Sequence, residues 1–386
     1  MRICLAYILF SPTFLTSGVG WAAERKSLFE DRVAIPLSVT HTHRGYTGDI
    51  VELRDGSLLL AYAAPPESRY SGGIAARKST DRGRTWGNEF LMQANAGKIE
   101  TISANLHRLA NGELLLGYLV TDNYEGAEHR LYSGHYYVRR SKDEGRTWSH
   151  PICITPYPGF HNINPDRIFQ VSSGRLIAPT EWSMAAGGGE AGHMVSLCYY
   201  SDDGYIWLRS KNYVDVGSTT EEPSIVELKD GRLLMVFRNK LGYIGRAYSK
   251  DNGDTWSKHE LLGLPSPLAP QLITRVPATG DLLLLWCNNS HAPARARRES
   301  QPKVKVAQLN PTLGEVRAPL TAAISRDEGE TWEHIRNLAE DPDGSYGDYG
   351  YPGVTWIDKG SVALVNFHSL DGLHVARVGV EWFYGK

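Results

Sequence analysis

The stretch STDRGRTW at residues 79–86 recurs along the chain with few changes. In the most altered copy, Tyr200 and Ile206 replace the usual Ser and Thr. A motif that repeats at such intervals indicates a chain built from similar structural units. The further copies are SKDEGRTW at 141–148, YSDDGYIW at 200–207, SKDNGDTW at 249–256 and SRDEGETW at 325–332.

A second phrase, DGSLLLAY at 55–62, occurs six times. Each copy is a turn pair followed by a short, mostly apolar run, and another run of strand length precedes it. Strand, glycine turn and strand together are the pattern of a β-hairpin. The other copies are NGELLLGY at 111–118, SGRLIAPT at 173–180, DGRLLMVF at 230–237, TGDLLLLW at 279–286 and KGSVALVN at 359–366.

One eight-residue box lies between each of the first five hairpins and the next hairpin. The repeating unit is therefore about four strands in roughly 50 to 80 residues, which is typical of a propeller blade. We predict that residues 24–386 form one all-β domain, a six-bladed β-propeller of four-stranded antiparallel blades with box turns. Five boxes suffice for six blades if RVAIPLSV at 32–39 supplies the last blade with its missing strand.

The composition of the box suits a tight turn between neighbouring strands. Its Ser and Asp can bond nearby backbone amides, its Gly can take a positive φ, and its Trp can bury a large ring between blades. A calcium loop is the alternative, but it needs several carboxylates at alternating positions, which the boxes do not supply. We therefore expect the boxes to fasten the fold, with no metal site and no cofactor.

The charges of the chain are nearly balanced, with 41 Lys and Arg against 43 Asp and Glu. Such a chain lacks the overall positive charge that binding to nucleic acid requires, so we expect no nucleic-acid partner. Cys153, Cys198 and Cys287 are too widely spaced for a zinc pattern. We expect them to be small buried side chains.

The first residues differ in kind from the rest of the chain. After MR comes the apolar run ICLAYILFSPTFL, which Pro12 interrupts, and then GVGWAAE with its small residues. This order is typical of a secretory signal peptide, here residues 1–23, and predicts a secreted or periplasmic protein. An anchoring helix needs a longer unbroken apolar run, so we expect no membrane span in the mature chain.

The repeat also predicts where a functional site should lie. The innermost strand of each blade lines the central axis, so the residues just before it gather at one mouth of the channel. Glu222 and Tyr351 hold the same repeat position and should converge, either as a functional pair or as a buried structural pair. Seven residues after a hairpin glycine stand Glu181 and Arg238. Nine residues before each hairpin glycine stand Thr47, Ser103, Pro165, Glu222, Gln271 and Tyr351.

With these boxes and hairpins, the chain resembles the sialidase (neuraminidase) superfamily over nearly all of its mature length. The segment EEPSIVELKDGRLLMVFRN is similar to the family's blade-four segment at Glu222 and Arg238. RAPLTAAISRDEGETW resembles another family segment at Arg317, and YGYPGVTWID resembles the nucleophile segment at Tyr351. The resemblance implies an exported exo-glycosidase that removes a terminal acidic keto-sugar from a glycan, with retention, through a Tyr nucleophile.

The chemistry of these residues is coherent with that implication. The planar fork of Arg binds a carboxylate in a bidentate way, so an Arg cluster selects a sugar acid. A neutral phenol approaches such a substrate without charge repulsion. Because the pKa of a free phenol is about 10, Tyr351 needs a base beside it, and that role falls to Glu222.

Two positions depart from the family pattern. In HTHRGYTGDIVELRDG the nearest Arg, Arg44, is two positions out of register with the first family Arg. The usual acid/base Asp before the first box is missing, and Asp49 is the preferred candidate for that role, followed by Asp166. We place Arg44, Asp166, Arg167 and Glu181 with the substrate-binding residues. Arg167 and His161 either shape the sugar pocket or stabilise a loop.

Two other functions stay open on the same scaffold. A non-catalytic carbohydrate-binding propeller would explain the missing Asp and the displaced Arg. A glycosidase or lyase that acts on a different sugar would keep the fold and change the pocket. The sequence does not name the sugar, the linkage or the oligomeric state.

Overall fold

The computed structural model describes residues 28–36, 48–65, 67–123, 132–184, 193–290, 317–340 and 349–386. The predicted signal peptide, Arg44 and Thr47 lie outside these residues. Strands dominate the described chain, and its helical structure is confined to η2 (Asp358–Gly360) and α2 (Val380–Phe383). The prediction of an all-β fold is confirmed.

All six predicted hairpins are present, and each pairs its two strands antiparallel across the predicted glycine turn. Their strands are β2 (Gly48–Glu52) with β3 (Leu58–Ala63), β6 (Glu100–Arg108) with β7 (Leu114–Asn123), β11 (Phe169–Gln170) with β12 (Leu176–Ser183), β15 (Thr220–Glu227) with β16 (Leu233–Asn239), β19 (Leu272–Arg275) with β20 (Leu282–Cys287), and β23 (Gly350–Ile357) with β24 (Val362–Ser369). The predicted hairpins are therefore confirmed.

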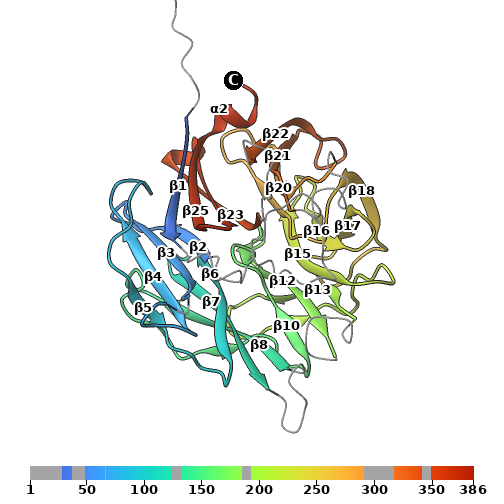
Figure 1. The fold of residues 1–386 in the computed structure, drawn as a ribbon. Helices are drawn as coiled ribbons and strands as arrows, with labels where there is room; N and C mark the ends of the chain where they lie inside the picture. Colours follow the sequence, from blue (N-terminus) through green and yellow to red (C-terminus); the bar gives the residue numbers. More distant parts are fainter. Residues whose placement is uncertain are drawn as a thin grey trace, which may run out of the picture.

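Two outer strands extend each of the first five hairpins into a four-stranded antiparallel group. Figure 1 shows the groups arranged around a common centre, with β2, β6, β15 and β23, the first strands of their hairpins, on the side toward that centre. A parallel pairing through β10 (Phe160–Asn162) joins the second and third groups into one nine-stranded sheet. The outer strands are β4 (Ile74–Ser79), β5 (Phe90–Gln93), β8 (Tyr132–Ser141), β9 (Ile152–Cys153), β13 (Val195–Ser201), β14 (Leu208–Arg209), β17 (Tyr243–Ser249), β18 (Glu260–Pro265), β21 (Leu320–Ser325) and β22 (Glu333–Ala339).

The last group takes its outermost strand from the other end of the chain. β25 (Gly372–Gly379) pairs with β24, and β1 (Phe29–Pro36) pairs antiparallel with β25. The prediction that the segment at 32–39 completes the last group is confirmed for residues 32–36, and residues 37–39 lie outside the described chain.

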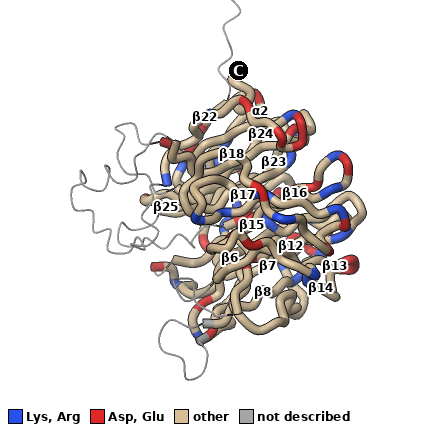
Figure 2. The backbone as a smooth tube through the Cα atoms, turned by 90° about the vertical axis from the view of Figure 1, so that its right-hand side faces the viewer, with Lys and Arg blue, Asp and Glu red and all other residues tan. Residues whose placement is uncertain are grey.

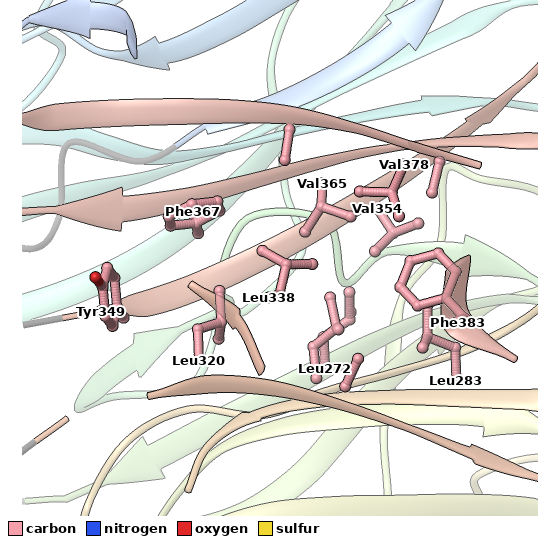
Figure 3. Packing of buried hydrophobic residues seen from close by; sticks show 14 of the residues in the cluster. Leu272, Leu283, Leu320, Leu338, Tyr349, Val354, Val365, Phe367, Val378 and Phe383 are labelled. Carbon is pink, nitrogen blue, oxygen red and sulfur yellow. The ribbon is translucent and has the colours of Figure 1, made fainter. Parts of the chain in front are cut away.

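Six clusters of buried apolar side chains hold the groups together. Among the described residues, five of the clusters lie between groups that follow one another in the chain. The sixth joins Leu364 and Val375 of the last group to Leu58 and Leu60 of the first. Figure 3 shows the cluster between the fifth and sixth groups, to which Phe383 of α2 adds its ring. Among the described strands, no sheet closes on itself by backbone pairing, so side-chain packing carries the contact between the last group and the first.

The intact boxes share one hydrogen-bond pattern. In the first box, Oγ of Ser79 donates to Asp81 at 2.8 Å and accepts the N–H of Gly83 at 2.9 Å. Asp81 also accepts the N–H and the hydroxyl of Thr85, at 2.9 and 2.6 Å, and Gly83 takes the predicted positive φ of 87°. The boxes at 141–148, 249–256 and 325–332 repeat these bonds. The box is therefore a fastened turn, as predicted.

The box at 200–207 departs from the predicted alignment. Ser201, not Tyr200, ends its strand opposite Leu176, and its Oγ donates to Asp203 at 3.1 Å and accepts the N–H of Gly204 at 2.8 Å. Gly204 follows Asp203 directly, whereas one residue separates the Asp from the Gly in the intact boxes. The turn is thus one residue shorter, and the prediction that Tyr200 replaces the serine is wrong.

The surface mixes both signs of charge. Figure 2 shows acidic and basic residues side by side along the loops of one face, and ion pairs such as Arg175 with Asp202 and Arg246 with Glu260 join them. Within the described ranges, no helix has the length and hydropathy needed to cross a membrane.

Candidate active site

Three innermost strands, β6, β15 and β23, carry a β-bulge at the repeat position nine residues before the hairpin glycine. One residue of each bulge has a left-handed backbone, with φ of 56° for Ser103, 49° for Glu222 and 52° for Tyr351. Bulges re-aim side chains next to active sites, and the strain of such residues persists only where the surrounding structure holds them. The predicted equivalence of Glu222 and Tyr351 is therefore confirmed.

Arg238 lies at the centre of this group of side chains and is buried. In the ladder between β15 and β16 it stands directly opposite Glu221. Its Nε donates to Oε2 of Glu221 at 2.8 Å, and its Nη2 contacts the same oxygen. Its Nη1 lies 2.7 Å from Oε2 of Glu222 as an ion pair. One guanidinium thus meets two carboxylates of the protein.

The electrostatics of Arg238 identify its other neighbours. Burial alone would lower the pKa of Arg238, but the negative charges of Glu221 and Glu222 outweigh burial and raise that pKa well above its ordinary value. Tyr351 and Glu181 act in the same direction, so both lie within electrostatic range of the guanidinium. The structure therefore brings Glu181, Glu222, Arg238 and Tyr351 together, as the repeat predicts.

Glu181, in β12, supports the bulge of β15. Its Oε2 accepts the backbone N–H of Glu222 at 3.0 Å, and its Oε1 accepts Nδ2 of Asn162 at 2.9 Å. Burial and then the charges of Glu222 and Glu221 raise the pKa of Glu181 well above its ordinary value. This carboxyl group is therefore disposed to hold its proton beside the ionised groups.

Arg317 stands before β21 and is buried, with Nη2 donating to the carbonyl of Leu268 at 2.7 Å. Its own carbonyl accepts the N–H of Tyr349 at 3.0 Å. A methyl group at Gly350 would lie 3.4 Å from Nη1 of Arg317. The second predicted Arg therefore sits beside the strand start that carries Tyr351.

Asp49 lies in β2 with both carboxylate oxygens bonded to the backbone. Oδ1 accepts the N–H of Ile50 at 2.7 Å, and Oδ2 accepts the N–H of Leu106, in the next strand group, at 2.8 Å. Asn105 and Ser224 occupy the same repeat position, and each likewise accepts a backbone N–H from the next group, at 2.7 and 3.1 Å. The contacts of Asp49 are thus those of a connection between neighbouring groups.

Asp166 also adopts a left-handed backbone, with φ of 56°, one residue after the predicted Pro165. Its Oδ2 accepts the N–H of Val354 at 2.5 Å, which links the third strand group to the sixth. Burial raises the pKa of Asp166 to about 6, against the opposing effects of that hydrogen bond and of Arg167. Burial, and then the nearby charge of Asp166, also raise the pKa of Asp49.

Arg167 ties three strand groups together at the centre. Its guanidinium donates to the carbonyls of Pro165 and Gln271 at 2.9 Å each and to that of Pro352 at 3.2 Å. On the hairpin-turn side, a cavity of about 370 Å³ is lined by Asp166, Arg167 and the inner strands β15 and β19. Of its two predicted roles, Arg167 has the contacts of a stabilising residue.

His161 is fully buried, and its polar contacts are with Gly134 and Tyr199 rather than with Arg238. Its Nδ1 is 3.2 Å from the carbonyl of Gly134, and its Nε2 is 3.1 Å from the hydroxyl of Tyr199. Burial lowers the pKa of His161 to about 3. These contacts match the loop-stabilising alternative. In the part of the chain that the structure describes, no group of three or more His, Cys, Asp or Glu side chains could hold a metal ion.

Sequence reasoning missed Glu221 and Asn162. Glu221 stands next to Glu222, so a count along an unbroken hairpin would set Glu222, not Glu221, opposite Arg238. The bulge shifts the register by one residue, so that Glu221 takes the place opposite Arg238 that Glu222 would otherwise hold. Asn162 is the last residue of the short strand β10, and its contacts reveal it: its Oδ1 accepts the hydroxyl of Ser103 at 3.1 Å, and its Nδ2 donates to Glu181 at 2.9 Å.

Comparison with known proteins places the chain in a family. A family model described as a BNR repeat-like domain matches residues 101–364. The chain belongs to this family. Its relatives include a sialidase of Micromonospora viridifaciens, 30% identical over 359 residues, and a sialidase of Bacteroides fragilis, 25% identical over 350 residues. These alignments cover 86% and 82% of this chain, but only 50% and 58% of the two relatives.

Solved structures agree with this BNR repeat-like membership at the level of the fold. A Hadza microbial sialidase superposes with a TM-score of 0.66 at 20% identity, covering 87% of this chain and 66% of that one. A protein of unknown function from Dyadobacter fermentans superposes equally well, at 18% identity and over 92% of this chain. The predicted resemblance to the sialidase superfamily is confirmed.

Proposed function

We propose that the chain is a glycoside hydrolase of the sialidase type, which removes a terminal acidic keto-sugar from a glycan with retention. The observation that carries the proposal is the convergence on Arg238 of Glu222 and Tyr351, two residues set by equivalent bulges. The sialidases among its relatives support the same class of reaction.

Tyr351 is the nucleophile in this proposal and Glu222 its base. The phenol oxygen attacks the anomeric carbon while its proton passes to a carboxylate oxygen of Glu222, and the bond to the leaving oxygen breaks. Oε2 of Glu222 is buried and lies 2.7 Å from Nη1 of Arg238 as an ion pair, but it accepts no hydrogen bond within the described chain. An acceptor left in this state suits a group that must take a proton. Water then cleaves the sugar from Tyr351 by the reverse proton movements.

Asp166 is better suited than Asp49 to protonate the leaving oxygen. A general acid must hold its proton near the working pH, and burial raises the pKa of Asp166 to about 6. Oδ1 of Asp166 has no hydrogen bond among the described residues, whereas both oxygens of Asp49 are bonded to backbone N–H groups. We therefore assign the acid/base role to Asp166 and a connecting role to Asp49.

Arg317 and Arg238 would hold the carboxylate of the sugar, together with Arg44 from outside the described residues. Both are buried, and a guanidinium in a dry site binds a carboxylate more strongly than one in water. We further propose that the six strand groups form a closed six-bladed propeller, as the packing of the last group on the first suggests, and that residues 1–23 direct export.

A panel of aryl α-glycosides of sialic acid and related keto acids tests the proposal. Release of the aryl alcohol from at least one of them, with loss of that release in Tyr351→Phe, is the expected result. Release from none of them would contradict the assignment.

A non-catalytic glycan-binding protein is the second candidate. The backbone bonds of Asp49 favour it, because they leave the preferred sequence candidate unsuited to proton transfer. Such a protein would return its glycan unmodified after binding. Mass analysis of the recovered glycan therefore separates the two functions. A glycan-binding protein would also lose little affinity for its glycan on Tyr351→Phe.

A further inference from the structure

Every nitrogen of the Arg238 guanidinium already faces a carboxylate of the protein. Nε and Nη2 contact Oε2 of Glu221, and Nη1 faces Oε2 of Glu222. A carboxylate bound by Arg in a bidentate way uses two of these nitrogens. The edge of Arg238 that would bind a substrate carboxylate is therefore occupied by Glu221.

Glu221 is held in this place by more than its charge. It stands opposite Arg238 in the β15–β16 ladder, and its second oxygen accepts the hydroxyl of Thr219. The bulge that begins after Glu221 turns Glu222 away from the ladder and leaves Glu221 as the residue in register. Both side chains of the pair are shielded, with exposures of 9% for Arg238 and 14% for Glu221.

The charge balance leads to the same conclusion. Among the described residues proposed to hold the sugar carboxylate and those that pair with them, Arg238 and Arg317 carry two positive charges, and Glu221 and Glu222 carry two negative ones. A substrate carboxylate that reaches Arg238 either displaces Glu221 or brings a third negative charge beside it. A buried carboxylate that loses its cation is strongly disfavoured, so this displacement weakens the binding of an acidic sugar.

We propose that Glu221 is a specificity-determining residue that competes with a substrate carboxylate for the guanidinium of Arg238. The inference rests on the proposed function, because it assumes that the sugar binds in the pocket around Arg238. Its consequence is a site that binds an acidic sugar and the corresponding ester with similar affinity. The substrate class thereby widens to sugars in which the carboxylate is esterified or absent.

The test measures the affinity of 2,3-dehydro sialic acid and of its methyl ester by titration calorimetry. For the wild-type chain we expect the two dissociation constants to agree within about tenfold, or ~1.4 kcal/mol. Glu221→Gln keeps the shape of the side chain and removes its charge. We expect it to bind the acid about tenfold or more tightly than wild type, with the affinity for the ester nearly unchanged.

Two further variants protect the test against a folding defect. Thr219→Val removes the hydroxyl that holds Glu221 and leaves every charge in place, so a smaller gain for the acid alone is expected. Glu227→Gln is the matched control, because Glu227 lies at the far end of β15 and binds Ser172. It should change neither affinity.

The inference is overturned if the wild-type chain prefers the acid to its ester by about a hundredfold or more. It is equally overturned if Glu221→Gln is folded and gains no affinity for the acid, or binds neither ligand. Hydrolysis that depends on Tyr351, without any gain in Glu221→Gln, would keep the proposed function and remove this inference. A gain in affinity for the acid in Glu221→Gln, without hydrolysis by the wild-type chain, would keep this inference and remove the proposed function.

Discussion

The box turns of the outer strands and the bulges of the innermost strands use repetition in different ways. At the boxes, both backbone and side chains recur, and the same Ser, Asp and Thr make the same bonds in four turns. At the centre the left-handed backbone recurs, while the side chain changes from Ser103 to Glu222 to Tyr351. Repetition of side chains thus accompanies a structural role, and repetition of backbone alone accompanies a site built from different groups.

Tyr351→Phe should separate the two regions most sharply. Only a hydroxyl is lost, so the melting temperature should stay close to that of wild type. Turnover of an activated aryl glycoside should fall by roughly 10⁴-fold or more, as expected for a nucleophile that acts as a unit with its base. Tyr248→Phe, on an outer strand, is the control and should leave kcat unchanged. Turnover near the wild-type rate in Tyr351→Phe would contradict the proposed mechanism.

Arg238→Met should lower stability more than any change at a box. Removing one partner of a buried ion pair costs about 3–5 kcal/mol, and here two carboxylates, Glu221 and Glu222, lose their cation. Chemical denaturation measures the loss. Arg246→Met removes a more exposed pair with Glu260 and should cost less than about 1 kcal/mol. Equal losses of stability in the two variants would show that the ion pairs of Arg238 stabilise the fold no more than those of a surface Arg.

Asp166→Asn should change how activity depends on pH. Because burial raises the pKa of Asp166 to about 6, the acid form predominates below that pH and disappears above it. Activity toward substrates with poor leaving groups should therefore fall as pH rises through about 6, and the variant should lose about 10²-fold activity below it. Asp49→Asn serves as the comparison. If it removes this pH limb while Asp166→Asn keeps it, the two roles are exchanged.

The smallest effect is expected within the boxes themselves. Thr147→Val removes a hydroxyl that donates to Asp143 at 2.6 Å and should lower the free energy of unfolding by about 1 kcal/mol. In the short box, Ile206 stands only three residues after Asp203, one fewer than in an intact box. Ile206→Thr should therefore recover less than half of that energy. A full gain would mean that the short turn can adopt the intact geometry.

Local patterns explain what the sequence could predict. A hairpin needs only two adjacent strands and a turn, so all six hairpins, and the equivalence of Glu222 with Tyr351, follow from counting residues around glycines. The first strand could be placed on the last group because six hairpins left one group short of a strand. Each of these inferences depends on spacing alone.

The remaining features depend on contacts between distant segments. A bulge changes the register by one residue without a distinctive sequence, so the pairing of Glu221 with Arg238 was hidden. The bond from Asp49 to Leu106 spans two strand groups, and no local pattern shows that it engages the carboxylate. The short box at 200–207 was misaligned because a start at Tyr200 keeps the motif spacing of Asp202, Gly204 and Trp207. A start at Ser201 keeps only the serine and Asp203 in place.

Covalent trapping with a 2,3-difluoro sialic acid tests the central claim most directly. After incubation and proteolysis, mass spectrometry should find one sugar on the peptide that contains Tyr351, and Glu222→Gln should slow the labelling. Labelling of another residue, or no labelling of a chain that turns over substrate, would contradict the account.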